Sequence, residues 1–210
     1  MIERRHLRES VRELIRERIV RRQLPENQSI GEIALAEEFG VSRTPVRETL
    51  LGLERDGFVK AIPGRGFVVQ PLSADEARQL YPIVWGLETL AIREAGKIPA
   101  AAIAELRSLN ARLGEATTPE ERTRHDTEWH RSLVAIGGNR RLGVVLEGVK
   151  ASIARYEHAF LGAADRRDHS VADHERIIRL LDQDPARAAE ALETHWREGL
   201  RVVLAAIPTR

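Results

Sequence analysis

Cysteine is absent from this 210-residue sequence. The absence excludes disulfide bonds and thiolate metal sites, and it is compatible with the cytoplasm. No apolar stretch approaches the roughly 20 residues that a membrane-spanning helix requires. The N-terminus, Met-Ile-Glu-Arg-Arg-His, is charged from its start and does not have the form of a secretory signal. We therefore expect a cytoplasmic protein with no membrane association and with one or two domains.

An excess of charge of either sign is also absent. The chain carries 33 Lys and Arg against 32 Asp and Glu, a formal net charge of +1. This balance excludes a uniformly basic surface, and taken alone it is weak evidence against DNA binding. Any affinity for DNA would have to come from a few locally placed cations.

Residues 32–58 predict two helices joined by a tight turn. Gly40 permits the sharp backbone turn, Ser42 is a natural N-cap, and Pro45 falls in the first turn of the second helix. The apolar positions at helical spacing are Ile33, Ala36 and Phe39 in the first helix and Val46, Leu50 and Leu53 in the second. A preceding amphipathic helix is expected to end before Leu24-Pro25.

The first turn of the second helix has the composition of a DNA-reading tip. Arg43 and Arg47 lie one turn apart, with Thr44 beside them, at the positive end of the helix dipole. Arg can donate two hydrogen bonds to guanine in the major groove, and Thr can reach a phosphate. The alternative is an ordinary helical hairpin with solvated arginines.

A short β-hairpin is predicted directly after this helix. The β-prone runs 58–62 and 67–70 are separated by Pro-Gly-Arg-Gly at 63–66, which is a tight-turn composition. Such a hairpin would place Arg65 and the backbone of Gly64 beside a DNA groove or phosphate.

Beyond residue 71 the sequence predicts helices alone. Ser73 can cap the first of them, and no β-alternating run intervenes. We expect an N-terminal domain over 1–71 and an antiparallel six-helix bundle over 72–210, so that the protein is mainly α. The predicted helices are approximately 74–96, 100–115, 119–136, 140–161, 168–182 and 185–206, and the fourth has the apolar stripe Leu142, Val145, Leu146 and Val149.

Three of these helices direct polar residues at the bundle interior. Asp126 and His130 are four apart on one helix face, His174 leads an apolar stripe, and His195 lies within another. Buried polar groups need partners, and a divalent cation would satisfy all four together. Imidazole and carboxylate suit Zn²⁺, but also Ni²⁺, Mn²⁺ or Fe²⁺. A metal site and a hydrogen-bonded polar cluster are equally consistent with these residues.

The N-terminal motifs also carry a family resemblance. Leu-Ala-Glu-Glu-Phe-Gly-Val-Ser-Arg-Thr-Pro-Val-Arg-Glu-Thr-Leu, followed by Leu-Glu-Arg-Asp-Gly-Phe-Val and a Gly-Arg-Gly turn, resembles the winged helix-turn-helix of GntR-family transcription regulators. The resemblance implies a homodimeric regulator, in most such cases a repressor, that binds a near-palindromic operator in double-stranded DNA. The implied DNA contacts are Ser42, Arg43, Thr44, Arg47, Gly64 and Arg65.

The helical part resembles the effector domain of the FadR-like subfamily, an FCD-type domain. This resemblance rests on Asp-x-x-Trp-His-x-x-Leu at 126–133, on Gly-Gly-Asn at 137–139 and on the two later histidines. It implies that Asp126, His130, His174 and His195 hold a metal beside a small-molecule effector, typically a carboxylate. The arginine that usually helps to bind an acidic effector is replaced by Val84, and Arg155 is a candidate to supply the cation instead.

Two other functions are compatible with these residues. A metalloenzyme could use the Asp and His cluster, although four protein ligands leave few open positions and no nucleophile or oxyanion motif is present. A metal-stabilised scaffold could use its N-terminal domain to bind protein. The expectation is a regulator without catalytic residues.

Overall fold

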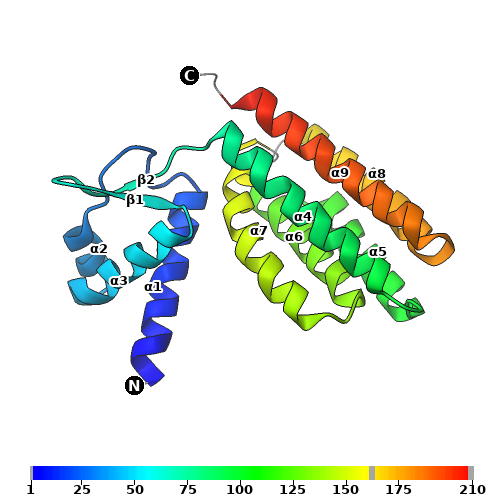
Figure 1. Cartoon of the computed structure of the whole chain (residues 1–210), viewed down its shortest axis with the longest axis horizontal. Coiled ribbons are helices and arrows are strands. Elements are labelled where there is room, and N and C mark those ends of the chain that lie inside the picture. Colours follow the sequence, from blue (N-terminus) through cyan, green and yellow to red (C-terminus); the bar gives the residue numbers. More distant parts are fainter. Residues whose placement is uncertain (1, 161–163, 208–210) are drawn as a thin grey trace. The chain divides into compact units, whose positions relative to one another are not determined.

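The structure, a computed structural model, describes the backbone of residues 2–160 and 164–207 and the side chains of residues 9–159 and 168–207. Contacts between Cα atoms divide the chain into two compact units, Met1–Leu72 and Ser73–Arg210. This division falls one residue after the expected domain boundary. Figure 1 shows helices in both units and strands in the first alone among the described residues.

The first unit contains the predicted helix-turn-helix and hairpin. In chain order its elements are α1 (Ile2–Val20), α2 (Glu32–Glu38), α3 (Arg43–Arg55), β1 (Val59–Ile62) and β2 (Gly66–Val69). Gly40 has φ +64° in the turn between α2 and α3, a conformation that glycine adopts without strain. The strands pair antiparallel with Val59 opposite Val69. Helix α1 packs on α3, and their buried faces join apolar residues of α2 and the hairpin in the core of this unit.

Two details of this unit differ from the sequence-based expectation. Ile33 is 55% exposed, and Leu35 joins Ala36 in the core of α2 instead. The spacing of apolar residues on a seven-residue helix is compatible with either face, so packing decides. The segment around residues 26–30 also pairs with β2, since Ile30 N–H donates to Phe67 O at 2.7 Å and Asn27 N–H to Val69 O at 3.0 Å.

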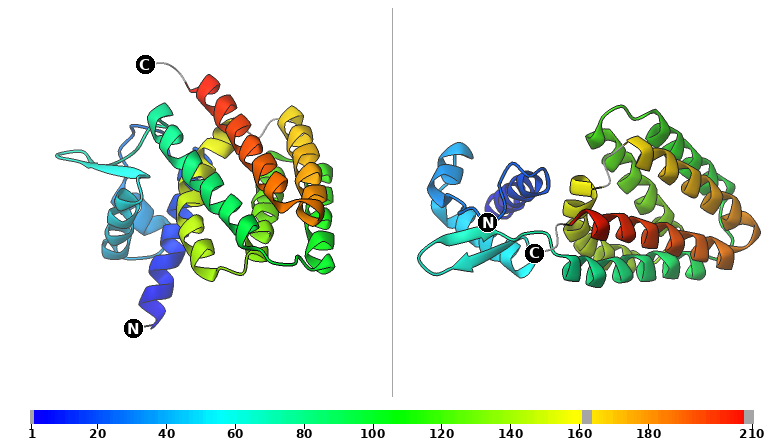
Figure 2. Two further views of the ribbon diagram at one scale, coloured as in Figure 1. Left: turned by 45° about the vertical axis from the view of Figure 1, so that its right-hand side comes forward. Right: turned by 90° about the horizontal axis from the view of Figure 1, so that it is seen from above.

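The second unit consists of the six expected helices, and the mainly α fold class is confirmed. They are α4 (Ala74–Glu94), α5 (Ala100–Glu115), α6 (Pro119–Ile136), α7 (Arg140–Phe160), α8 (Ala164–Gln183) and α9 (Pro185–Ala206). Helix α4 packs against α9, α7 and α6, while α8 lies between α9 and α5 (Figure 2). Within the described residues, none of the helices combines the length and the hydrophobicity of a membrane-spanning segment.

Several helices of this unit begin at residues whose side chains satisfy a first-turn N–H group. Ser73 accepts from Glu76 N, and Asn139 accepts from Leu142 N at 3.1 Å, as predicted. Thr118 and Glu121 form a reciprocal capping box at α6. The cap at Ser73 has a second support, because its N–H donates to Tyr156 Oη of α7 at 3.1 Å and that hydroxyl donates to Glu76.

The buried stripe of α7 differs from the predicted one. Leu142 and Leu146 are buried, but Val145 is 57% exposed, and the buried face continues to Ile153. Positions 142, 146 and 153 share one face of a helix with 3.6 residues per turn, whereas 145 lies about 100° away from 146. The same face includes Lys150, whose side chain is 13% exposed. A charged residue therefore lies within the apolar stripe.

Close backbone contact fixes the end of α6 against α4. A Cβ atom placed on Gly137 would lie 2.6 Å from the carbonyl oxygen of Ala91, so only glycine fits there. This contact sets the position of α6 relative to α4, and both helices contribute residues to the site described next.

Candidate metal centre and nucleic-acid interface

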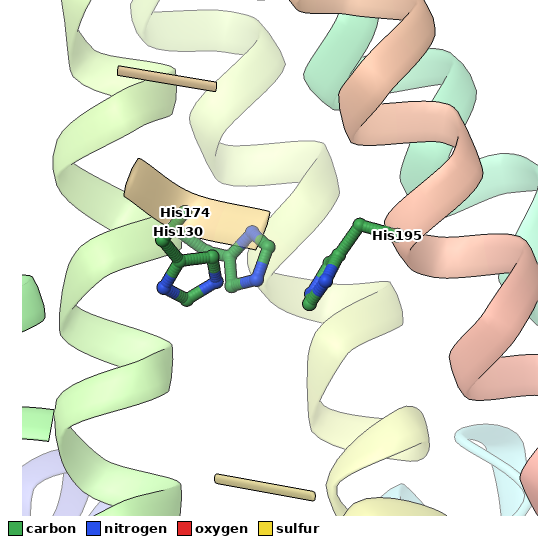
Figure 3. Close-up of side chains that lie close together, drawn as sticks. All are labelled: His130, His174 and His195. Atoms are coloured by element: carbon green, nitrogen blue, oxygen red, sulfur yellow. The ribbon is translucent and has the colours of Figure 1, made fainter. Parts of the chain in front are cut away.

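Three imidazoles from three helices meet inside the second unit. His130 of α6, His174 of α8 and His195 of α9 are all buried, and one ring nitrogen of each lies within 4.8 Å of the others. Figure 3 shows the three rings close together, each reaching inward from its own helix. This spacing lets one ion contact a nitrogen of every ring.

The Asp126 carboxylate lies at the edge of this cluster. Its Oδ2 is 3.8 Å from His130 Nε2, and its Oδ1 is 3.7 Å from His174 Nε2. The i, i+4 spacing on α6 brings Asp126 and His130 together, and tertiary packing adds His174. The structure thus gathers all four residues of the predicted ligand set, with the three histidines forming the tighter group.

Neighbouring side chains orient the rings. His130 Nδ1 bonds to Glu88 Oε2 at 2.8 Å, and His195 Nδ1 bonds to Asp173 Oδ2 at 3.0 Å. The His174 ring stacks on Trp129, with centroids 3.6 Å apart and planes 1° from parallel. Metal-binding histidines in proteins are typically held in this way by a carboxylate on the other ring nitrogen.

The nitrogens that face the cluster are suited to a metal. Among the described residues, no hydrogen bond satisfies His130 Nε2 or either nitrogen of His174. Burial lowers the pKa of His174 well below its ordinary value, and the charges of His195, His130 and Lys150 lower it further. Burial also lowers the pKa of His130 in spite of the Glu88 charge. Neutral imidazoles with unshared lone pairs are metal ligands, and leaving them buried without a partner is costly.

Sequence reasoning missed three charged residues around the cluster. Glu88 has no exposed surface, and Lys150 Nζ lies 2.8 Å from its Oε1. Burial raises the pKa of the Glu88 carboxyl, but the charges and hydrogen bonds of His130 and Lys150 outweigh that effect and hold the pKa at about 2. Burial and the charge of Asp126 raise the pKa of Glu157 to about 7. The available signal was the interruption of the α7 stripe by Lys150 and Glu157 at helical spacing.

Val84 and Arg155 lie in different surroundings. Val84 has no exposed surface and is part of the core. Arg155 is 5% exposed, and its charge acts on the neighbouring Tyr156 phenol. Lys150 is the α7 cation whose charge acts on His130 and His174.

The predicted DNA-reading residues all lie on the surface of the first unit. The exposed residues are Ser42, Arg43, Thr44, Arg47, Gly64 and Arg65. The Ser42 hydroxyl makes no cap hydrogen bond to α3. Arg47 forms an ion pair with Glu32 at 2.9 Å, yet 61% of its side chain remains exposed. Arg65 donates to Asn27 O at 3.3 Å. A surface of this kind can offer several donors to a DNA edge or phosphate.

Comparison with known families agrees with this two-part organisation. Residues 7–69 match the model of the bacterial regulatory proteins of the gntR family. Residues 79–198, more than half of the chain, match the FCD domain. The chain belongs to the FCD-containing gntR family.

Relatives in this family are transcription regulators. The chain is 32% identical over 168 residues to the uncharacterized HTH-type transcriptional regulator YdhC of Bacillus subtilis, covering 77% of this chain and 74% of that protein. It is 29% identical over 186 residues to the Nta operon transcriptional regulator of Aminobacter aminovorans, covering 85% and 87% respectively. The structure of E. coli McbR/YncC has the same fold, with a TM-score of 0.77 at 20% identity over 94% of this chain and 96% of that one.

Family membership decides between the functional classes. The protein is a DNA-binding transcription regulator of the gntR family and not an enzyme. The resemblance seen in the sequence is confirmed, whereas the individual DNA contacts stay predictions.

The tip of α3 provides the first of these tests. We expect Arg47→Ala to weaken binding to an operator selected from random duplex DNA by about 5- to 150-fold, because one bidentate Arg–guanine pair contributes about 1–3 kcal/mol. Fluorescence anisotropy at two salt concentrations measures this change. Arg55→Ala is the matched control, since Arg55 is an exposed arginine in the last turn of the same helix. Equal losses in the two variants would mean that Arg47 contributes charge alone.

Proposed function

We propose that this regulator is a cytoplasmic repressor whose operator binding is controlled by a carboxylate effector bound beside a divalent metal, with Zn²⁺ the first candidate. The ligands would be Asp126, His130, His174 and His195. The observation that supports this most strongly is the meeting of three buried imidazoles beside one carboxylate, where His130 Nε2 and both nitrogens of His174 have no hydrogen bond among the described residues. A purely structural polar cluster would be expected to pair these nitrogens with donors or acceptors.

The charges around the cluster favour an anionic effector once a metal is bound. The charges of Asp126, Glu88 and Lys150 all act on the Glu157 carboxyl, so three carboxyls and one ammonium of the described residues lie close enough to interact there. Without a cation this surrounding would repel a carboxylate. A divalent metal, when bound, supplies two positive charges and a coordination position for an effector oxygen. This chain has Val84 at the place on α4 where the family resemblance implies an arginine. The metal and Lys150 would therefore supply the positive charge that attracts the effector.

Control of DNA binding follows from linkage. An effector that prefers one arrangement of the helical unit shifts the population of arrangements, and it changes operator affinity to the same extent that operator changes effector affinity. A repressor is released from DNA when the effector favours the arrangement with weaker operator binding.

The helical unit also provides a surface for a second copy of the chain. Helices α4 and α7 pack side by side, and both expose large apolar side chains. Ile83 and Leu90 of α4 are 47% and 39% exposed, and Val144 and Val145 of α7 are 69% and 57% exposed. Covering such side chains stabilises association. A dimer formed here would present two reading helices, as a near-palindromic operator requires.

Removal of one imidazole tests the metal. We expect His174→Ala to reduce bound metal to near background in elemental analysis of protein purified without added metal. The variant would keep only three of the four proposed ligands, and two of these, Asp126 and His130, come from one turn of α6. His125→Ala is the control, since His125 lies on the same helix as His130 but pairs with Glu128. Unchanged metal content in His174→Ala would contradict the proposed centre.

The effector class can be tested with the same variant. Small carboxylates that bind metal-loaded protein are expected to raise its melting temperature, since saturation at 100 times Kd adds about 2.7 kcal/mol of stability. Those compounds should weaken operator binding, and they should have no effect on His174→Ala or on chelator-treated protein. Equal stabilisation of the chelated protein would contradict a carboxylate bound at the metal.

A charge placed on the exposed apolar surface tests the dimer. We expect Val145→Asp to shift the protein from dimer to monomer in light scattering after size exclusion, and to weaken operator binding. Leu14→Asp, a substitution at a 43% exposed side chain of α1, should leave the oligomeric state unchanged. If the protein remains a dimer in both Val145→Asp and Ile83→Asp, the subunit interface lies elsewhere.

A further inference from the structure

One buried carboxylate joins four helices around the candidate metal centre. Glu88 of α4 accepts from His130 Nδ1 of α6 at 2.8 Å and from Trp196 Nε1 of α9 at 2.7 Å, both on Oε2. Lys150 of α7 lies 2.8 Å from the other oxygen, Oε1. Glu88 is therefore in contact with a proposed ligand on one side and with a cation on the other.

We propose that Glu88 is the positioning residue of the metal centre and that Lys150 tunes its effect, so that this pair sets the affinity for the metal. The inference rests on the proposed metal function and adds two residues that are not ligands themselves.

The first part of the inference follows from the hydrogen bond to His130. A carboxylate can only accept, so Nδ1 of His130 must carry the proton and Nε2 must present its lone pair. Nε2 is the atom that faces Asp126, at 3.8 Å from its Oδ2. Glu88 thus holds the His130 ring in the tautomer and orientation that a metal requires, and its negative charge makes the imidazole a stronger donor.

Lys150 acts on the same carboxylate in the opposite direction. Its ammonium neutralises part of the Glu88 charge, and it also lies 5.3 Å from the centroid of the Trp196 ring. Less negative charge then remains to polarise His130. Lys150 lines a surface cavity of about 250 Å³ together with Arg131 and Glu147, and its side chain is 13% exposed, so a replacement must keep the apolar stem to preserve the packing.

A purely structural role for this network makes a different prediction. If Glu88 and Lys150 only stabilise the packing of α4, α7 and α9, substituting either residue lowers stability and changes metal affinity in the same direction. The positioning role requires opposite directions for the two residues.

The experiment measures metal affinity of the full-length protein at one fixed pH, by competition between Zn²⁺ and a chromophoric chelator. We expect Glu88→Gln to weaken binding by about 10–100-fold. We expect Lys150→Met, which keeps the apolar stem but removes the charge, to tighten binding by roughly tenfold. Glu147→Gln is the control, because Glu147 is an exposed carboxylate on α7 that pairs with Arg131.

Two further measurements separate positioning from general effects. The visible absorption of Co²⁺-loaded protein should change in Glu88→Gln and not in Glu147→Gln, since Glu88 is hydrogen-bonded to the proposed ligand His130. In the Glu88→Gln background the tightening by Lys150→Met should shrink, because Lys150 would act through the missing charge. An undiminished tightening would show that Lys150 repels the metal directly, and it would overturn the tuning role.

The outcomes distinguish this inference from the proposed function. If the unmodified protein binds no Zn²⁺, the metal function fails and the inference fails with it. If the protein binds Zn²⁺ but Glu88→Gln leaves affinity and the Co²⁺ spectrum unchanged, only the inference is overturned. Should Glu88→Gln not fold, weaker binding in Lys150→Met overturns the inference by itself.

Discussion

The second unit depends on how it accommodates negative charge in its interior. A carboxylate without exposed surface is costly unless donors surround it, and removing one partner of a buried ion pair typically costs about 3–5 kcal/mol. Glu88 meets this requirement through an imidazole, an indole and an ammonium, each from a different helix. Helices α4, α6, α7 and α9 must therefore keep their mutual positions for the charge to remain paired. The same positions bring His130 and His195 close to each other and to His174.

The first unit solves a different electrostatic problem. With a net charge of only +1 the chain cannot rely on a general attraction to DNA. It exposes a small number of cations on α3 and the hairpin, and one of them, Arg47, is held by Glu32 while most of its side chain stays exposed. An arginine held at one nitrogen retains other donors in its planar group. The ion pair therefore limits the freedom of the side chain without using all of its hydrogen-bonding capacity.

Local signals in the sequence were sufficient for much of this structure. Ser73, Asn139 and Gly40 act within a few residues of themselves, so the helix starts and the turn could be read from the chain. The sequence did not show whether Ile33 and Val145 would face the core or the solvent. A short apolar pattern fits more than one helix face, and the packing of the neighbouring helix decides which face is buried.

The candidate site was predictable in part for a related reason. Asp126 and His130 are linked by helical spacing, His174 and His195 lie in apolar helical stripes, and the family resemblance favoured a metal over a hydrogen-bonded polar cluster. Glu88 was not identified because its partners His130 and Trp196 are 42 and 108 positions away in the chain. Residues that pair over such distances in the chain produce no periodic pattern in the sequence. A lysine in an apolar stripe is visible in a sequence, but its meaning depends on the carboxylate that it meets.

The hydrogen bonds at Ser73 have a mechanical consequence. Tyr156 of α7 is hydrogen-bonded to Ser73, the residue at which the chain enters the helical unit. Tyr156 lies six residues after Lys150 on the same helix. A shift of α7 along α4 would stretch this attachment or move Ser73 with it. The connection to the DNA-binding unit starts at this anchored residue, so strain created deep among the helices would reach the linker without any loop having to rearrange.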